Sequence, residues 1–492
     1  MLDFRALVEQ ALQALEQERP ADAEKAIRTA LGMSPRDDQL LHLLGVALVR
    51  QQREEEAIEP LQKAISLNRR DAEYHNALGI ALRNSGRVGE GIESIQRALK
   101  LDPGLQDAHF NLGQAYQRTG EFAMAEEKFR FIQKHSPGDV EVIAALSNLH
   151  WFMGNHDGAL QSLRDGIAAN PASGDMRFLL GEQLLALGRF EEGWLNYLWR
   201  VNRHVFLRKV GLPFDSPALM QPFAALLEGV SLCVHAEQGI GDDLFFLRFV
   251  RSLRERGARV EGAVTPRLID MIGRSCALDR CEPAAERIPP GATYRLLGDL
   301  PFLLEAHRLP VPAAVRFVAL PERMASVAAR LKDLPRPLTG LTWRAGTGPE
   351  AGNRNVLFKE APFDDFIALA RRLPGTLLVL QRQPKPGEVE KLSAACGGRL
   401  IDFSALNADL EEMLALLAQL DEYVGVSNTN MHLCAALGRS ARVLVSRSVE
   451  FRWMAAGAES PWFPGFPVYR QGVLGGWKEA FAGLAADLNA GR

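Results

Sequence analysis

Hydrophobic and small residues recur every 34 positions over the first two hundred residues of the chain. In "LLGVAL", "ALGIAL" and "NLGQAY" a leucine precedes a small residue, and two further steps reach "ALSNLH" and "LLGEQL". A second small residue follows twelve positions later in every unit. The first small residues are Gly45, Gly79, Gly113, Ser147 and Gly181, and the second are Ala57, Gly91, Ala125, Ala159 and Gly193.

This period predicts pairs of helices that stack along the chain, because two small positions let the helices of each pair approach closely. Prolines recur near the ends of the units, and we predict that each begins the next helix, where a missing N–H leaves no hydrogen bond unmade. The pattern resembles the tetratricopeptide repeat, and we expect an all-α solenoid over residues 1–207. The prolines are Pro35, Pro103, Pro137 and Pro171.

A solenoid of this kind presents a concave surface that suits an extended polypeptide. We therefore expect a protein or peptide partner in the groove of the repeats. The candidate groove residues are asparagines on the first helix of their units, Asn76, Asn111 and Asn148. The alternative is that these three side chains are only solvated.

The pattern of the chain changes after residue 207. Residues 208–228 contain three prolines and are predicted to form a linker. Beyond them, short apolar runs alternate with amphipathic segments, which predicts parallel sheets covered by helices on both faces. We expect one Rossmann-like domain at 229–335 and a second at 336–492, with a cleft at the carboxyl ends of both sheets. The expected strands are 231–235, 259–264, 293–298, 338–343, 376–381, 399–403, 422–427 and 441–446.

Composition gives no general support for nucleic acid or a membrane as a partner, although it leaves a local basic groove open. The 492 residues are 47% hydrophobic and 24% charged with a formal net charge of −3, so no overall basic field favours nucleic acid or an anionic membrane. The five cysteines form no CxxC pair and no zinc-like spacing, which favours reduced thiols in a cytoplasmic protein without a metal site. We expect neither a signal peptide nor a membrane-spanning helix.

The stretch "HAEQGIGDD" follows the first expected strand and leads into an apolar helix. Gly239 and Gly241 loosen a turn that also contains Gln238, and Asp242 and Asp243 stand where the helix begins. A helix start favours anions, but two carboxylates oppose a phosphate placed directly above them. The stretch therefore offers either an acid/base carboxylate or an ordinary helix cap.

A second turn, "VGVSNTNMHLCAALG", follows the strand expected at 422–427. Ser427, Asn428, Thr429 and Asn430 supply hydroxyls, amides and backbone N–H groups at a helix start, and His432 follows on the helix. These groups suit a diphosphate without opposing its charge. The alternative is again a helix cap, with a half-buried structural histidine behind it.

Two further segments contain charged and aromatic side chains. The long loop after the strand at 338–343 carries the cations Arg344, Arg354 and Lys359. These side chains either bind a phosphate or belong to a solvated face. The segment 448–471 is rich in aromatic residues, and we expect it to pack structurally or to cover the cleft.

Several blocks of the second half resemble a known group. They are "HAEQGIGDDLFFLRFVRSL", "GLTWRAG", "LQRQ", "HLCAALG", "FRWM" and "SPWFPGFPVYRQ". Together with the repeats they are similar to bacterial tetratricopeptide-repeat proteins with a GT-B glycosyltransferase-like region, which is related to heptosyltransferases and more distantly to O-linked N-acetylglucosamine transferase. The resemblance implies two Rossmann-like domains, with the nucleotide-sugar donor held mainly by the second and no metal required.

The resemblance also implies roles for individual residues. Asp242 matches an aspartate proposed to deprotonate the acceptor hydroxyl, and Lys359 matches a lysine that contacts donor phosphate. The donor-binding turn of the family reads Asp-Thr-x-x-x-His, and here Ser427 and Asn428 stand at the first two positions and His432 at the last. The expected donor-binding residues are Lys359, Arg344, Gln381, Ser427, Asn428, Thr429, Asn430 and His432, and the acceptor-side loop contains Gln238, Gly239, Gly241 and Asp243.

Three functions fit these patterns. The first is an inverting glycosyltransferase that uses a nucleotide sugar as co-substrate, needs no further cofactor, and modifies a protein presented by the repeats. The second is a catalytically inactive GT-B scaffold whose repeats bind a partner. The third is a sensor that binds the donor without transferring its sugar.

Overall fold

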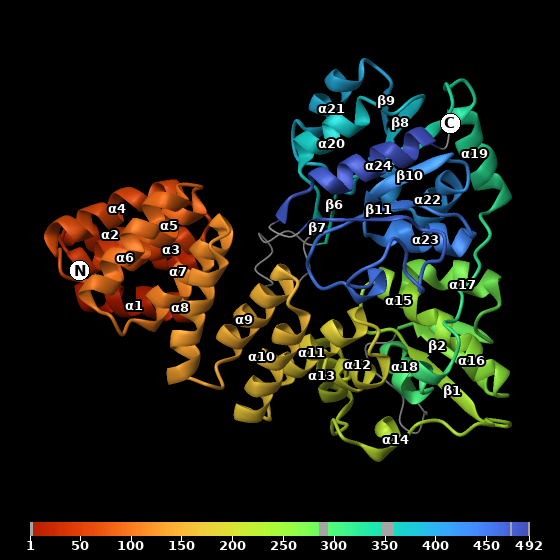
Figure 1. The fold of residues 1–492 in the computed structure, drawn as a ribbon, viewed down its shortest axis with the longest axis horizontal. Helices are drawn as coiled ribbons and strands as arrows, with labels where there is room; N and C mark the ends of the chain where they lie inside the picture. Colours follow the sequence, from red (N-terminus) through yellow and green to blue (C-terminus); the bar gives the residue numbers. More distant parts are fainter. Residues whose placement is uncertain (1–2, 285–293, 347–358, 473–474, 491–492) are drawn as a thin grey trace. The chain divides into compact units, whose positions relative to one another are not determined.

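The computed structural model describes residues 3–284, 294–346, 359–472 and 475–490. Contacts within the chain divide it into two compact units, Met1–Pro171 and Ala172–Arg492. The described part of the first unit is all helical, whereas the second combines helices with parallel sheets (Figure 1). No helix of the described residues is long and apolar enough to cross a membrane.

The first unit consists of five helical hairpins that follow the 34-residue period. The first helices of successive hairpins begin at residues 4, 38, 72, 106 and 140, and α11 (Gly174–Ala186) of the second unit continues this series at residue 174. The helices are α1 (Phe4–Glu16), α2 (Pro20–Met33), α3 (Asp38–Arg50), α4 (Glu54–Leu67), α5 (Ala72–Asn84), α6 (Val88–Leu101), α7 (Gln106–Thr119), α8 (Phe122–His135), α9 (Val140–Met153) and α10 (His156–Ala169).

The small residues of the repeats lie where the two helices of a hairpin touch. A Cβ atom added at Gly79 of α5 would lie 2.3 Å from Cγ1 of Ile95 and 2.9 Å from the carbonyl oxygen of Gly91, both on α6. In the next hairpin, a Cβ at Gly113 would lie 2.6 Å from the ring of Phe129. These distances are shorter than van der Waals contact, so the close helix packing requires glycine at these positions.

The prolines of the repeats do not begin helices, contrary to the prediction. Pro35 lies three residues before α3, and Pro137 lies three residues before α9. The helix starts are capped by acidic side chains instead: Asp37 accepts a hydrogen bond from the backbone N–H of Leu40 at 3.0 Å, and Asp139 caps α9 in the same way. Because these side chains satisfy the first N–H groups, the prolines only fix the backbone of the preceding turns.

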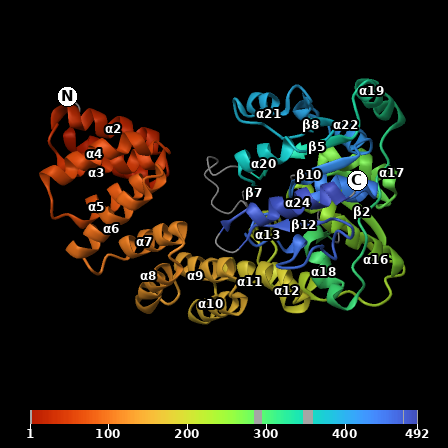
Figure 2. The same ribbon diagram turned by 45° about the horizontal axis from the view of Figure 1, so that its top comes forward.

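The second unit opens with helices and continues into a four-stranded parallel sheet. Its strand order is β3-β2-β1-β4, so the order reverses between β1 and β4. Helix α12 lies beside α18 in both views (Figure 2). The elements are α11 (Gly174–Ala186), α12 (Phe190–Tyr197), α13 (Val201–Val210), α14 (Pro217–Met220), β1 (Ser231–His235), α15 (Ile240–Phe246), α16 (Val250–Glu255), β2 (Arg259–Val264), α17 (Ile269–Ser275), β3 (Arg280–Pro283), β4 (Tyr294–Leu296) and α18 (Leu300–Leu303).

A six-stranded parallel sheet follows, with the strand order β12-β11-β10-β5-β8-β9. Two halves of the sheet extend in opposite directions from β5, so the order reverses between β5 and β10. A two-stranded antiparallel pair, β6 (Arg344–Ala345) and β7 (Lys359–Glu360), follows β5. The other elements are α19 (Pro321–Leu331), β5 (Leu338–Thr342), α20 (Phe363–Ala370), β8 (Thr376–Val379), α21 (Glu388–Cys396), β9 (Leu400–Asp402), α22 (Leu410–Leu417), β10 (Glu422–Val426), α23 (Thr429–Leu437), β11 (Arg442–Val445), β12 (Val468–Arg470) and α24 (Lys478–Ala490).

The six-stranded sheet has its main core on the face covered by α20, α21 and α24. Leu341 and Val424 of the strands pack there with Phe366 of α20 and Phe481 of α24. Figure 1 shows these helices on one side of the sheet and α22 on the other. The eight expected strands are thus all present, some of them shorter, while β3, β6, β7 and β12 were not expected. Arg280 and Glu282 of β3 are exposed, so its sequence carries no run of buried residues.

Candidate functional site

The point at which the six-stranded sheet reverses its order lies between β5 and β10, and the turn after β10 begins α23. In an open parallel sheet the loops on either side of such a point leave toward opposite faces and create a crevice. Asn428 occupies the N-cap of α23 and accepts a hydrogen bond from the backbone N–H of Asn430 at 2.8 Å. Its amide nitrogen donates to the hydroxyls of Thr342 and Tyr423, each at 2.9 Å. Asn428 therefore ties the start of α23 to the end of β5.

Lys359, Ser427 and Glu450 form a polar cluster beside this turn. The Lys359 ammonium group lies 2.6 Å from Oε1 of Glu450 and 3.3 Å from the Ser427 hydroxyl oxygen. The same hydroxyl donates to Oε1 of Glu450 at 2.5 Å. Glu450 and Ser427 are buried, whereas 14% of the Lys359 side chain remains exposed. The cluster is thus a buried carboxylate and hydroxyl beneath an ammonium group that reaches solvent.

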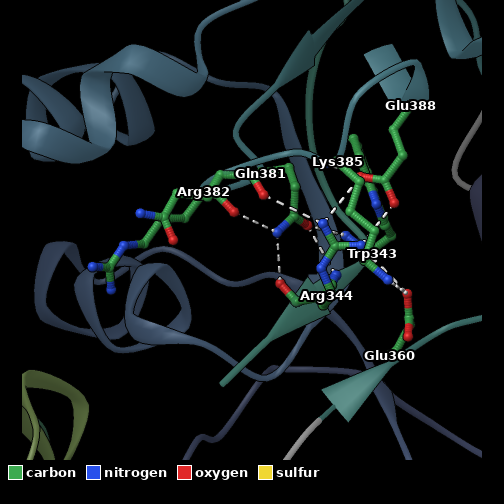
Figure 3. Close-up of polar contacts among 8 residues, drawn as sticks. Trp343, Arg344, Glu360, Gln381, Arg382, Lys385 and Glu388 are labelled. Carbon is green, nitrogen blue, oxygen red and sulfur yellow. Dashed lines mark hydrogen bonds and ion pairs between the residues drawn. The ribbon is translucent and has the colours of Figure 1, made fainter. Parts of the chain in front are cut away.

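Arg344 and Gln381 are occupied by contacts within the chain (Figure 3). The guanidinium of Arg344 pairs with both carboxylate oxygens of Glu388, at 2.7 and 3.0 Å. The amide oxygen of Gln381 accepts from the backbone N–H groups of Trp343 and Arg344, and its amide nitrogen donates to the carbonyls of Arg344 and Arg382. Both side chains therefore hold the end of β5 in place, and their predicted role in donor binding stays a prediction.

The two loops singled out in the sequence meet at the N-terminal turns of α15 and α23. A Cβ atom added at Gly241 would lie 3.5 Å from the ring of His432 and 3.9 Å from the hydroxyl of Thr429. Gly239 is the N-cap of α15, and its backbone N–H donates to Oδ2 of Asp242 at 3.3 Å. The first turns of these helices therefore lie against each other, and Asp242 helps to cap α15 as the alternative interpretation expected.

Arg452 connects Asp242 to the segment between β11 and β12 of the second sheet. It belongs to the short 3-10 helix η7 (Phe451–Trp453), and its guanidinium pairs with Oδ1 of Asp242 and lies over the rings of Phe245 and Phe451. Both carboxylate oxygens of Asp242 thus have a partner, Oδ2 in the helix cap and Oδ1 in this ion pair. Arg452 and Glu450 are the site residues that the sequence patterns did not identify, although "FRWM" was recognised as a block.

Burial changes the ionisation of two neighbours of this ion pair. Asp243 is almost fully buried and accepts a hydrogen bond from the hydroxyl of Thr265. Burial raises the pKa of Asp243 to about 7, and this hydrogen bond only partly opposes the rise. Burial, together with the charges of Arg452, Arg248 and Lys359, holds the pKa of His432 well below its usual range. His432 is therefore neutral at pH 7.

The chain itself fills the corresponding crevice of the four-stranded sheet. Arg200, next to α13, pairs with Glu237 at 2.6 Å and with Asp299 at 2.7 Å, and Arg203 pairs with Asp299 at 2.9 Å. None of these four side chains is more than 3% exposed. Gln238 of the same loop accepts a hydrogen bond from the Tyr197 hydroxyl at 3.1 Å. Helices α12 and α13 therefore close the space above β1 and β4.

The three groove candidates of the repeats differ in exposure. Asn76 is buried, and its amide oxygen accepts a hydrogen bond from Asn111 at 3.2 Å, which joins α5 to α7. Asn111 is half-buried, and Asn148 of α9 is exposed. Asn111 and Asn148 are accordingly the two candidates whose side chains reach the surface. Arg354 lies outside the described residues.

Comparison with known proteins defines the repeats. A tetratricopeptide-repeat model matches residues 8–75, 76–140 and 145–193. Protein FlbA of Caulobacter vibrioides is 26% identical over 344 residues, which cover 64% of this chain and 54% of FlbA. The chain thus spans about half the length of this curated relative.

Solved structures of two tetratricopeptide-repeat proteins are similar to part of this chain. A thermophilic tetratricopeptide-repeat protein of Thermus thermophilus is 20% identical and covers 37% of this chain and 100% of its own, with a TM-score of 0.34. A repeat protein of Parabacteroides merdae is 18% identical and covers 41% of this chain and 78% of its own, with a TM-score of 0.34.

The chain therefore carries tetratricopeptide repeats, a class of helical array that binds protein partners. An α/β region with parallel sheets follows the repeats.

Proposed function

We propose that the α/β region is a GT-B glycosyltransferase, built from two Rossmann-like domains, that transfers a sugar from a nucleotide-sugar donor with inversion. The strand orders support this proposal, because both sheets reverse their order next to their first strand, as doubly wound nucleotide-binding sheets do. The contact between the first turns of α15 and α23 also supports it, since it unites loops from the carboxyl ends of both sheets.

The observation that carries the proposal is the position of Lys359 beside the first turn of α23. A helix N-terminus and an ammonium group both favour negative charge. A donor diphosphate at this turn would compete with Glu450 for Lys359. Stabilising the charge that develops on the leaving diphosphate is the largest contribution expected from such a site.

The proposed reaction is a single displacement. The acceptor hydroxyl oxygen attacks the anomeric carbon of the donor sugar, the bond from that carbon to the diphosphate oxygen breaks, and the electron pair of that bond leaves with the nucleoside diphosphate. The hydroxyl proton passes to a carboxylate of the protein, for which Asp242 is the candidate from sequence. Repeats that bind proteins make a protein the proposed acceptor.

A catalytically inactive scaffold is the second candidate function. The contacts of Arg344 and Gln381 favour it, because two of the expected donor-binding side chains already have partners within the chain. In that case the repeats bind a partner, and the α/β region contributes no reaction.

Binding of nucleoside diphosphates distinguishes these candidates. We expect uridine, guanosine, adenosine or thymidine diphosphate to raise the thermal unfolding temperature, since a ligand at 100 times its Kd stabilises the folded state by about 2.7 kcal/mol. Lys359→Met should abolish the increase, whereas Lys391→Met, which changes an exposed lysine of α21, should retain it. If none of the four nucleotides stabilises the protein, the glycosyltransferase proposal is wrong and the scaffold is favoured.

A further inference from the structure

The last repeat hairpin contributes a carboxylate to the site described above. Glu182 lies on α11, the helix that continues the 34-residue series into the second unit. One helical turn later, on the same face, the carbonyl oxygen of Ala186 accepts a hydrogen bond from the backbone N–H of Ala455 at 2.7 Å. Ala455 follows η7 closely, so this face of α11 packs beside the segment that carries Arg452.

Glu182 belongs to the same group of charges as the residues of the site. Its carboxylate interacts electrostatically with Arg452 and Lys359, which are cations, and with Asp242 and Glu450, which are anions. It also acts on the hydroxyl of Tyr197, which lies on α12. Helix α11 therefore places a third carboxylate close to those of Asp242 and Glu450.

The three carboxylates differ in their direct partners. Asp242 is held by the backbone of Gly239 and by Arg452, and Glu450 is held by Lys359 and Ser427. Among the described residues, no group forms a hydrogen bond or an ion pair with the Glu182 carboxylate, and the residue keeps partial contact with solvent. Of these three carboxylates, that of Glu182 is thus the one that is free to accept a hydrogen bond from a ligand.

We propose that Glu182 accepts the proton of the acceptor hydroxyl, and that the last repeat hairpin thereby completes the active site. This inference rests on the proposed glycosyl transfer. As the acceptor oxygen bonds to the anomeric carbon and the nucleoside diphosphate departs with the electron pair, the hydroxyl proton moves to Oε of Glu182. The resulting carboxylic acid then loses this proton to water, which restores the carboxylate. Asp242 remains paired with Arg452 and positions the first turn of α15.

The ionisation of Glu182 suits this role. Burial, reinforced by Asp242 and Glu450 and opposed by Arg452 and Lys359, raises the pKa of Glu182 to about 7. A general base is most effective when its pKa lies near the working pH, because it is then both ionised and basic. The rate should therefore rise with pH as Glu182 ionises, through about pH 7.

The pH dependence of the reaction tests the assignment. The full-length protein is incubated with nucleotide sugars that carry glucose or N-acetylglucosamine on uridine, guanosine, adenosine or thymidine diphosphate. Release of the nucleoside diphosphate is measured from about pH 5 to pH 9. In Glu182→Gln the rate should fall about 100-fold or more and lose its rise through neutral pH. Thermal stabilisation by the nucleoside diphosphate should remain, because Glu182 does not hold the donor. Glu182→Asp should recover the pH-dependent rise at a reduced rate.

Two matched variants complete the experiment. Asp175→Asn makes the equivalent change at an exposed position in the first turn of the same helix and should leave the rate and its pH dependence unchanged. Asp242→Asn should lower the rate but retain the rise through neutral pH.

The outcomes separate the inference from the function on which it rests. If Glu182→Gln retains the pH-dependent rise and Asp242→Asn loses it, Asp242 is the base, and the inference fails while the glycosyltransferase proposal stands. If the unmodified protein neither binds nor hydrolyses any of these donors, both proposals fail.

Discussion

The carboxyl ends of the two sheets share a topology but differ in what covers them. Above β1 and β4, Arg200 and Arg203 lie in a buried cluster with Glu237 and Asp299, in which two positive charges face two negative ones. Beside β5 and β10, where the first turn of α15 meets α23, charged side chains remain in contact with solvent: 14% of Lys359 and 28% of Asp242 are exposed. One crevice is filled by the chain's own helices, whereas the other holds accessible charges.

This difference shows that a reversal of strand order produces a crevice but does not by itself produce a binding site. Burying ion pairs removes four charged groups from water, which is tolerated only because each guanidinium has a carboxylate beside it. The first crevice is accordingly structural, and it fixes α12 and α13 to the sheet. At the second crevice, by contrast, the charged side chains of Lys359 and Asp242 still reach solvent.

Removing one charge from the buried cluster should have the largest effect. Asp299→Asn leaves Arg203 and Arg200 with one carboxylate between them, Glu237, and we expect the free energy of unfolding to fall by about 3–5 kcal/mol. Chemical denaturation followed by the fluorescence of the second unit's tryptophans measures this change. Asp270→Asn, at an exposed position of α17, is the control. Equal stability of the two variants would show that the first crevice is not held by charge.

Asp243 provides a smaller, pH-dependent effect. Its pKa is raised to about 7 in the folded protein, mainly by burial, with Glu237 and Asp242 adding to the rise and Thr265 opposing it. The folded protein therefore binds a proton that the unfolded chain loses near pH 4, so stability should decrease as pH rises from about 4 to about 7. Asp243→Asn should remove this decrease and stabilise the protein at pH 8 by up to about 3 kcal/mol. Thermal unfolding at pH 5 and pH 8 checks the sign, and a variant that is equally destabilised at both pH values contradicts it.

Substitution of Arg344 should have the smallest effect, and it tests whether this side chain of the second crevice binds the donor. Arg344→Lys exchanges a two-point pairing with Glu388 for a single contact, and we expect the free energy of unfolding to fall by about 1 kcal/mol. Since Arg344 already has partners within the chain, nucleoside diphosphate binding should be retained. Calorimetric titration of the variant measures this binding. Loss of binding at unchanged stability would assign Arg344 to the donor, as the sequence alone suggested.

The repeats and the strands were predictable from sequence because both depend on local periodicity. Gly79 and Gly91 stand where one helix touches the next, and this requirement returns every 34 residues. The prolines were misplaced by three residues, because proline suits both a turn and a first helical position, whereas Asp37 and Asp139 perform the capping. Strand β3 was missed because it lacks a buried face.

The meeting of the two candidate loops was expected from the rule for parallel sheets, but the partners of their side chains were not. Arg452 pairs with Asp242 across 210 positions of the chain, and Lys359 pairs with Glu450 across 91. No periodicity relates such residues. Glu182 follows Gly181, the glycine that marks the repeat. The repeat pattern predicts that Glu182 lies on a helix, but it does not predict which side chains surround its carboxylate.

The sequence by itself determined where the chain forms helices and strands, since hydrophobic spacing and small residues act over a few turns. Only the tertiary structure decided which charged groups are paired and which remain available. Ion pairing, burial and pKa depend on distances of a few ångströms between distant segments, and these distances are set by how the sheets and helices pack. For this reason Arg344 and Gln381, both expected at the donor, hold the backbone of β5, while Glu182, from the last repeat hairpin, lies among the charges of the proposed active site.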